Sequence, residues 1–150
     1  MKPERPDTPT ELKVRALRYL ARREHSRAEL ARKLAPHAES RQALEVMLDD
    51  LTSRKQLSDE RYAETRAHWL ARKYGAAKIR QDLKAHGVLD AISERVSSER
   101  EDQRARAILA RKYPTPATTR QEKARRARFL QSRGFSYETI RRALALAESD

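Results

Sequence analysis

One pattern of apolar residues occurs three times in this chain. A leucine is followed nine or ten residues later by a leucine or an isoleucine, and another leucine stands four residues beyond that. Such repetition limits the fold to copies of one small unit, because a single copy cannot bury its own apolar face and must stack on the next. The three copies are Leu20, Leu30 and Leu34; Leu70, Ile79 and Leu83; and Leu130, Ile140 and Leu144.

Within each copy the spacings predict two short helices around a tight turn. Residues four apart lie on the same face of a helix, and an interval of nine or ten residues leaves room for a turn. A third helix would connect one copy to the next. The chain is rich in helix-forming residues and has only 3 glycines. We therefore predict an all-α protein of tandem three-helix, helix-turn-helix-like repeats that form an elongated, curved array.

Prolines set the expected boundaries between these repeats. Residues 1–9 hold three prolines and little that can pack, so we expect a flexible tail there. Pro114 and Pro116 cannot continue a helix and predict a loop near residue 115. The predicted organisation is a flexible tail at 1–9, repeat 1 at 10–56, repeat 2 with a long third helix at 57–112, and a truncated repeat 3 at 117–150.

The middle copy carries the clearest helix start and stop signals. Ser58 suits an N-cap, and Asp59 lies in the first turn, where the helix dipole favours negative charge. Gly75 permits the turn after this helix, and Gly87 stands where a left-handed C-terminal residue is needed. We predict that the structural motif of this repeat consists of Ser58, Asp59, Tyr62, Trp69, Gly75, Ile79, Leu83 and Gly87.

An aromatic residue precedes the first leucine of every copy, and a basic residue follows that leucine by three. The aromatics can anchor the small core, which is the interpretation we favour, or they can present flat rings on which unpaired bases stack. The basic residues can neutralise the negative end of a helix dipole, or they can place charges at regular intervals along a polymer. The aromatics are Tyr19, Trp69 and Phe129, and the bases are Arg23, Lys73 and Arg133.

The charge of the chain predicts a polyanionic partner. It contains 34 Lys and Arg against 22 Asp and Glu, which gives a net charge of +12. A cation of this size attracts nucleic acid or an acidic protein surface. The chain has no asparagine, and its second helices offer little side-chain chemistry for reading base edges. Recognition of a specific DNA sequence is therefore not expected.

Residue patterns typical of enzymes, metal sites and membrane proteins are missing from the sequence. There is no cysteine, no glycine loop for phosphate, and no apolar run long enough to span a bilayer. The serines suit helix caps better than nucleophiles. We expect no catalytic residue, no metal and no cofactor, and a cytoplasmic protein. The histidines lack metal-ligand spacing and are His25, His37, His68 and His86.

Three stretches of the sequence together resemble the RecX family, the regulators of the RecA recombinase. They read "LARREHSRAELARKL", "LSDERYAETRAHWLARKYGAAKIRQDLKAHGV" and "RRARFLQSRGFSYETIRRAL". The resemblance covers residues 12–146, and its most specific part is the middle block. The residues of that block in the order and spacing of the family are Asp59, Arg61, Tyr62, Gly75, Ile79, Leu83 and Gly87.

The resemblance implies a function as well as tandem three-helix repeats. Such proteins bind the RecA filament on DNA, lodge in its helical groove and inhibit strand exchange and ATP hydrolysis, which modulates DNA repair, recombination and the SOS response. The family is not enzymatic, and its members also bind single- and double-stranded DNA. We accordingly expect a monomer with these partners. One departure is that the last copy stops after its second helix at Asp150, so a full ninth helix is not expected.

We predict that the contact surface acts through positive charge toward acidic filament surfaces or DNA phosphates. The alternative is a non-specific DNA-binding helical repeat protein that competes with the recombinase for DNA. Both would bind DNA in a salt-sensitive way, but only a filament regulator acts when it is far scarcer than DNA sites. The predicted contact residues are Arg22, Arg23, Arg72, Lys73, Lys78, Arg80, Arg126 and Arg133.

Overall fold

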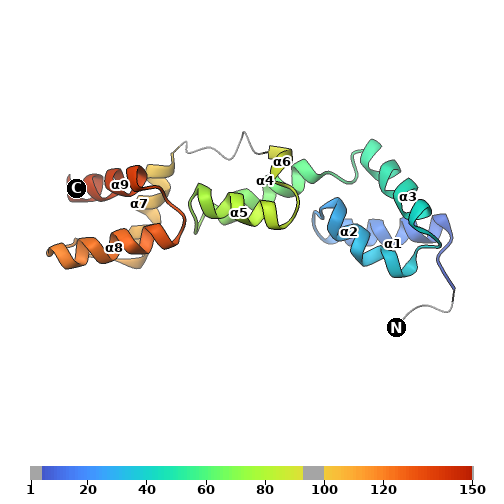
Figure 1. The fold of residues 1–150 in the computed structure, drawn as a ribbon, viewed down its shortest axis with the longest axis horizontal. Helices are drawn as coiled ribbons and strands as arrows, with labels where there is room; N and C mark the ends of the chain where they lie inside the picture. The colour runs from blue at the N-terminus through green and yellow to red at the C-terminus, as the bar shows by residue number, and fades with distance from the viewer. Residues whose placement is uncertain (1–4, 93–99, 150) are drawn as a thin grey trace. The chain divides into compact units, whose positions relative to one another are not determined.

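The computed structural model describes residues 5–92 and 100–149, and its regular elements there are all helices (Figure 1). Parts of the predicted tail (1–4), of the long third helix (93–99) and of the last repeat (150) lie outside the described residues. The all-α prediction is confirmed. The helices are α1 (Pro9–Arg22), α2 (Arg27–Leu34), the short 3-10 helix η1 (Ala35–His37), α3 (Arg41–Ser53), α4 (Asp59–Leu70), α5 (Ala76–Ala85), α6 (Leu89–Ile92), α7 (Glu101–Lys112), α8 (Arg120–Ser132) and α9 (Tyr137–Ser149).

The chain divides into two compact units, unit 1 and unit 2. Unit 1 consists of residues 1–65 and 86–91, and unit 2 consists of residues 66–85 and 92–150. The division falls inside α4, so it separates the parts of the predicted second repeat. Helix α5 therefore belongs to the same compact unit as α7, α8 and α9.

Helices α1, α2 and α3 form the core of unit 1, as their apolar stripes require. Each helix begins at a hydroxyl cap. The side chains of Thr8, Ser26 and Ser40 each accept a hydrogen bond from the backbone N–H three residues later, at 3.0–3.2 Å. Tyr19 packs against this core while half-buried. The fully buried leucines of the core are Leu12, Leu30, Leu34, Leu48, Leu51 and Leu57.

The end of the predicted tail is anchored on unit 1. The backbone N–H of Asp7 donates to the carbonyl oxygen of His37 at 2.8 Å, and the Asp7 carboxylate accepts from Arg15 Nε at 2.8 Å. The Arg15 guanidinium lowers the pKa of Asp7. Helix α1 then begins at Pro9. The prediction of a flexible tail over 1–9 therefore does not describe its last three residues, because Asp7 finds partners that only the folded unit supplies.

Asp59 joins the start of α4 to the start of α2. Its Oδ1 accepts from the backbone N–H of Arg27 at 2.8 Å, which satisfies one of the unpaired donors in the first turn of α2. Ser58 caps α4 itself, since its Oγ accepts from Arg61 N at 3.1 Å. The Arg61 guanidinium pairs with Glu24 at 2.8 Å. The first residues of α4 thus lock onto the turn between α1 and α2 within unit 1.

A neutral histidine is built into the same turn. His25 is 1% exposed, and its Nδ1 lies 3.0 Å from the carbonyl oxygen of Arg23. Its Nε2 lies 3.0 Å from Lys33 Nζ, which has only protons to donate. The imidazole therefore donates from Nδ1 and accepts at Nε2. Burial lowers the pKa of His25, and the positive charges of Arg23 and Lys33 act in the same direction.

This arrangement predicts that unit 1 loses stability in mild acid. Because the folded pKa of His25 lies below its ordinary value of 6.5, the unfolded chain takes up the proton first as the pH falls. Stability is complete above pH 6.5 and decreases below it, by about 1 kcal/mol for each pH unit until the folded pKa is reached. Thermal unfolding between about pH 7 and pH 5 measures this slope. His25→Gln should flatten it, whereas His68→Gln, at an exposed position, should not; an unchanged slope in His25→Gln contradicts the assignment.

Helices α7, α8 and α9 form the core of unit 2. The apolar residues of α7 stand at three- and four-residue spacing and pack against α8 and α9, with Phe129 half-buried beside them. We predicted residues 101–112 in the long third helix of repeat 2 and a truncated last repeat. In the structure α7 completes a three-helix group with α8 and α9. The buried side chains are Ala105, Ile108, Leu109, Leu130, Phe135, Ile140 and Ala143.

The start of α5 is capped by the turn between α8 and α9. Gly75 N donates to the Arg133 carbonyl oxygen at 2.7 Å, and Ala77 N donates to the Gly134 carbonyl oxygen at 3.3 Å. Ala76 N donates to Glu101 Oε1 at 2.7 Å, and Glu101 is only 4% exposed. These are the donors that a helix start leaves unpaired. Backbone carbonyls and one buried carboxylate from distant segments therefore fix α5 in unit 2.

This joint gives Gly75 a role that differs from the predicted one. A Cβ at Gly75 would lie 2.5 Å from the Gly134 carbonyl oxygen and 2.8 Å from Phe135 Cδ1. Gly134 is equally confined, since its Cβ would lie 2.5 Å from Lys78 Cγ, and its φ is +91°. Gly87 has a φ of +70°, as its predicted left-handed role requires, and a Cβ there would have no heavy atom within 4 Å. Gly75 is thus needed for close approach of two backbones.

Candidate functional site

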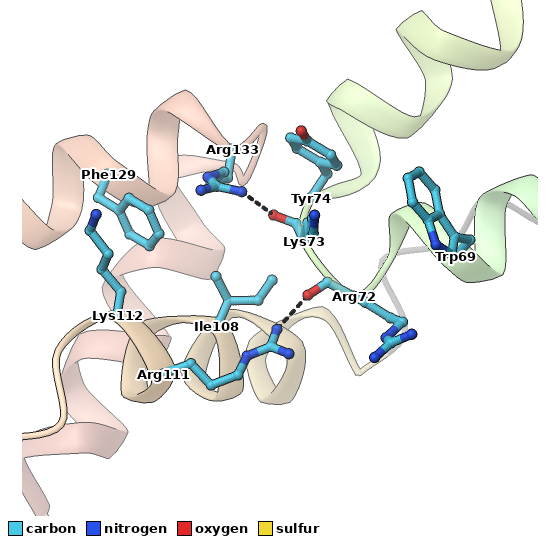
Figure 2. Close-up of a pocket in the computed structure, with 9 residues that line it drawn as sticks. All are labelled: Trp69, Arg72, Lys73, Tyr74, Ile108, Arg111, Lys112, Phe129 and Arg133. Carbon is cyan, nitrogen blue, oxygen red and sulfur yellow. Dashed lines mark hydrogen bonds between the residues drawn. The ribbon is translucent and has the colours of Figure 1, made fainter.

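A groove of about 690 Å³ lies in unit 2, where the C-terminal ends of α4, α7 and α8 come together (Figure 2). Five of its lining residues are cationic and three are aromatic, and none is acidic. Each cation lies at or just beyond the C-terminal end of a helix, where the negative end of the helix dipole stabilises positive charge. The lining residues are Trp69, Arg72, Lys73, Tyr74, Ile108, Arg111, Lys112, Phe129 and Arg133.

Two arginines hold the wall of this groove together. Arg111 donates a hydrogen bond to the carbonyl oxygen of Arg72, and Arg133 Nη1 donates to the carbonyl oxygen of Lys73 at 3.5 Å. Figure 2 shows Arg133 between Phe129 and Tyr74, and its guanidinium carbon lies 5.0 and 5.5 Å from the centres of these two rings. The arginines therefore fasten the turn after α4 to α7 and α8, through hydrogen bonds and cation–π contacts.

The remaining three cations are directed at solvent. Arg72, Lys73 and Lys112 are exposed, and the structure places no carboxylate of the described residues within ion-pair distance of them. Lys73 Nζ lies 5.9 Å from the centre of the Trp69 ring, and Lys112 Nζ lies 5.7 Å from that of Phe129. Concentrated positive charge without internal partners raises the local potential and attracts anions.

A second cleft of about 510 Å³ shares Trp69, Lys73 and Tyr74 with the groove. Its lining includes a bidentate ion pair between Arg66 and Asp82, with Nη2 to Oδ2 at 2.8 Å. The other lining residues are Leu70, Lys78 and Gln81. Trp69 therefore borders both concavities, and it is 55% exposed. Our prediction that this tryptophan anchors the core is wrong, because the adjacent Leu70 occupies the buried stripe of α4 and turns residue 69 outward.

The predicted contact residues separate into groups. The groove brings together Arg72, Lys73 and Arg133. We predicted all three as contact residues, although Arg133 lies about sixty residues after the other two in the sequence. Lys78 lines the neighbouring cleft, and Arg80 is exposed on α5.

Two cations of the groove, Arg111 and Lys112, were not predicted. A signal for them was present: the pentapeptide "LARKY" occurs at residues 70–74 and again at 109–113. In both places it closes a helix, α4 or α7, and supplies an adjacent Arg-Lys pair. Searching for short identical segments, in addition to the apolar spacing, would have identified this second pair.

Arg126 was predicted as a contact residue, but it is structural. It is 9% exposed, its Nη2 donates to the carbonyl oxygen of Thr115 at 2.7 Å, and its guanidinium lies 4.8 Å from the centre of the Tyr113 ring. The arginine thus holds the proline-rich loop against α8. The side chain is buried and its charged group already has partners within unit 2, so it is not available to a polyanion.

Arg126→Gln should therefore lower stability and leave anion binding unchanged. Losing a charged hydrogen bond and a buried cation–π contact costs about 1–3 kcal/mol. Thermal unfolding measures the first effect, and titration with single-stranded DNA at a temperature well below the transition measures the second. A tenfold loss of affinity in a folded Arg126→Gln protein contradicts this structural role.

In unit 1 the corresponding basic residues are neutralised internally. Arg23 donates two hydrogen bonds to the Glu29 carboxylate, at 2.7 and 2.9 Å, and this pairing lowers the pKa of Glu29 to about 2. Arg27 pairs with Glu45 at 2.7 Å and with Asp49 at 2.8 Å. Arg22 is exposed on α1. Equivalent positions in the sequence repeats therefore do not produce equivalent surfaces.

The described residues contain no group of three or more His, Cys, Asp or Glu side chains that could hold a metal ion. None of their helices is both long and apolar enough to cross a membrane. The groove's own chemistry is that of cations and aromatic rings.

Comparison with known proteins identifies three family domains in the chain. The models for the first, second and third three-helix domains of RecX match residues 13–46, 58–96 and 99–144. The third match begins before α7 and supports its grouping with α8 and α9. It also means that Leu109 at the end of α7, and not Leu130 in α8, corresponds to Leu20 and Leu70.

Curated relatives and solved structures agree with these matches. The chain is 46% identical over 142 residues to regulatory protein RecX of Leptothrix cholodnii, covering 93% of this chain and 90% of that protein. It is 43% identical over 147 residues to regulatory protein RecX of Ralstonia nicotianae, covering 96% and 92%. The crystal structure of RecX from Lactobacillus salivarius has the same fold, with a TM-score of 0.80, 20% identity and coverage of 95% and 97%.

Proposed function

The chain belongs to the RecX family of regulatory proteins, and we propose that it binds RecA–DNA filaments and inhibits their strand exchange and ATP hydrolysis. It acts as a monomeric, non-enzymatic regulator in the cytoplasm. The observation that carries this proposal is the groove of unit 2, whose five cations have no acidic neighbour among the lining residues.

The proposed contact works by charge. A nucleoprotein filament presents DNA phosphates and acidic side chains in a regular array, and a protein of net charge +12 is attracted to both. Exposed cationic side chains are gathered in the groove, whereas basic residues of unit 1 such as Arg23 and Arg27 are paired with carboxylates of the same unit. Several moderate contacts made by tandem repeats on one filament add up to strong binding, because later contacts form within an existing complex.

The absence of base-reading chemistry supports binding without strong sequence preference. The groove offers ammonium and guanidinium groups for phosphates and aromatic rings for ring faces, and its lining contains no Asn, Gln, Asp or Glu to read the edges of A or C. The same groove also favours the second candidate function, a DNA-binding protein that acts only by competing for DNA. The ratio of this protein to recombinase at which inhibition begins distinguishes these two functions.

The test is the ATPase rate of the cognate recombinase on single-stranded DNA while this protein is titrated. A filament regulator should inhibit at ratios well below one copy per recombinase, because one bound molecule affects many protomers. Inhibition that begins only when the DNA is nearly coated would support competition and overturn the proposal. Adding excess DNA is the control, since it relieves competition but leaves inhibition of preformed filaments intact.

A further inference from the structure

We propose that the groove of unit 2 holds an unpaired nucleic-acid strand by stacking one of its bases on Trp69. This inference deepens the proposed function, because it assigns the strand type that the same groove recognises. It rests on four features of the described residues: an exposed indole, cations in the same groove, neighbouring aromatic rings that are already covered, and the small number of side chains suited to reading base edges.

The fold does not need an indole at the outward-facing position 69. The apolar face of α4 is already provided by Tyr62, Ala63 and Leu70, all of which are buried. Trp69 instead presents 55% of its surface to solvent. An indole in water leaves a large apolar face uncovered, and stacking with a planar base would remove part of that face from water.

Among the groove's three aromatic residues, Trp69 is the accessible one. Tyr74 and Phe129 are half-buried, and the Arg133 guanidinium lies over both rings. Figure 2 shows Trp69 at one end of the lining residues, away from Phe129 and Lys112 at the other. A base can therefore approach the indole without displacing the contacts that hold the groove.

The cations beside Trp69 are arranged for the phosphates that accompany a stacked base. Arg72 and Lys73 stand three and four residues after it in the turn that follows α4, and the Arg72 backbone N–H donates to the Trp69 carbonyl oxygen at 3.3 Å. The equivalent pair, Arg111 and Lys112, lines the same groove from α7. A strand with its base on Trp69 thus has positive charge available from two segments of the same groove.

This chemistry selects single strands over duplexes and over acidic peptides. In a duplex the ring faces are covered by neighbouring base pairs, so only the phosphates remain for the groove to contact. An acidic peptide matches the charge but offers no ring to the indole. Base–aromatic stacking tolerates any base, which agrees with the few base-edge readers in the sequence.

The first experiment uses the single tryptophan of the chain as the reporter. The full-length protein is titrated with a short oligothymidylate, an abasic oligomer of equal length, a duplex of equal length and polyglutamate. We expect fluorescence quenching by oligothymidylate and an affinity about tenfold higher than for the abasic oligomer, from the energy of one stacked base. Equal affinities for the two oligomers overturn the inference, and so does polyglutamate binding as tightly as oligothymidylate.

Variants locate the effect, with anisotropy of a labelled oligomer as the readout. Trp69→Ala should lose about tenfold in affinity for oligothymidylate and none for the abasic oligomer, and Trp69→Phe should recover part of the loss. Tyr137→Ala is the matched control, because Tyr137 is an aromatic residue 79% exposed outside the groove, and its affinity should not change. Unchanged affinity in a folded Trp69→Ala protein overturns the inference.

The outcome can be separated from that of the proposed function. A Trp69→Ala protein that keeps its affinity for oligothymidylate, while wild-type protein inhibits the recombinase below stoichiometry, refutes the stacking site alone. A wild-type protein that stacks bases but inhibits only at DNA saturation refutes filament regulation alone.

Discussion

Replacing Arg72 and Lys73 by glutamate should weaken binding to single-stranded DNA by about 100-fold at about 0.1 M salt. Both side chains are exposed in the groove and lack carboxylate partners among the described residues. Each substitution removes one phosphate contact and adds a repulsive charge, at about 1–1.5 kcal/mol apiece. The slope of log affinity against log salt should also become shallower by about 1.4, since the loss of two phosphate contacts releases fewer counterions from a single strand.

The matched control is Arg32→Glu with Arg41→Glu, which changes the net charge by the same amount. Both residues are exposed in unit 1, so this pair tests whether charge matters by its place or only by its total. We expect a loss of a few-fold, from the weaker long-range attraction alone. Equal losses in the two double variants would show that the groove is not a distinct site.

Folding of the charge-reversed protein is not expected to suffer much. The hydrogen bonds at this turn use the backbone oxygens of Arg72 and Lys73, and these remain in the variant. A glutamate near the end of α4 opposes the helix dipole at a cost of about 0.3–1 kcal/mol. Circular dichroism and thermal unfolding check this, and inhibition of the recombinase ATPase should decrease in parallel with DNA affinity.

Gly75→Ala should destabilise unit 2 by about 2–4 kcal/mol and lower its unfolding temperature by about 10–20 °C. The new Cβ would lie 2.5 Å from the Gly134 carbonyl oxygen and 2.7 Å from the Gly134 carbonyl carbon. Backbone atoms cannot move aside as a flexible side chain does, so α5 must separate from the α8–α9 turn. The hydrogen bond from Gly75 N to the Arg133 carbonyl oxygen would lengthen or break.

Gly87→Ala is the control for this substitution. Gly87 has a left-handed φ of +70° but open space around a Cβ, so alanine should cost only about 1 kcal/mol, from backbone strain. Thermal unfolding followed by circular dichroism compares the two. If Gly75→Ala is no more destabilising than Gly87→Ala, the close approach of Gly75 and Gly134 does not contribute to stability.

Gly75→Ala should also change the arrangement of the residues that line the groove. Trp69, Arg72 and Lys73 line it from the α4 side, while Lys112 and Arg133 line it from α7 and α8. The Gly75–Gly134 contact lies in the joint between these segments. Gly75→Ala should therefore reduce DNA affinity even at temperatures where the protein is folded, whereas Gly87→Ala should leave it unchanged.

Local signals predicted much of the fold. The four-residue spacings of Leu30 and Leu34, and of Ile79 and Leu83, identified buried helix faces because a helix repeats its direction every 3.6 residues. Ser58 was predicted as an N-cap from its position before acidic residues, and its hydroxyl accepts the hydrogen bond from Arg61 N. Family membership also followed from the sequence, since the resemblance to RecX is confirmed by the domain matches.

Other assignments depended on which neighbour a segment packs against. Residues 101–112 have a short apolar stripe that suits the end of one repeat as well as the start of the next. Only contact with α8 and α9 assigns them to the latter. The sequence could not show which basic residues are available to a partner, for the same reason. Arg23 pairs with Glu29, Arg126 contacts Tyr113 and a backbone carbonyl group, and Lys73 is exposed to solvent. The position of a charged residue in the sequence does not show whether the folded chain brings an opposite charge or another polar group next to it.

The sequence by itself determined that this protein is helical, repetitive, basic and a member of the RecX family, because helix periodicity, charge and family motifs are local properties of the chain. The tertiary structure decided which cations stay available and which aromatic ring faces water. It did so because ion pairs, caps and close backbone contacts form between residues distant in sequence. The groove around Trp69 exists only where the ends of α4, α7 and α8 are brought together.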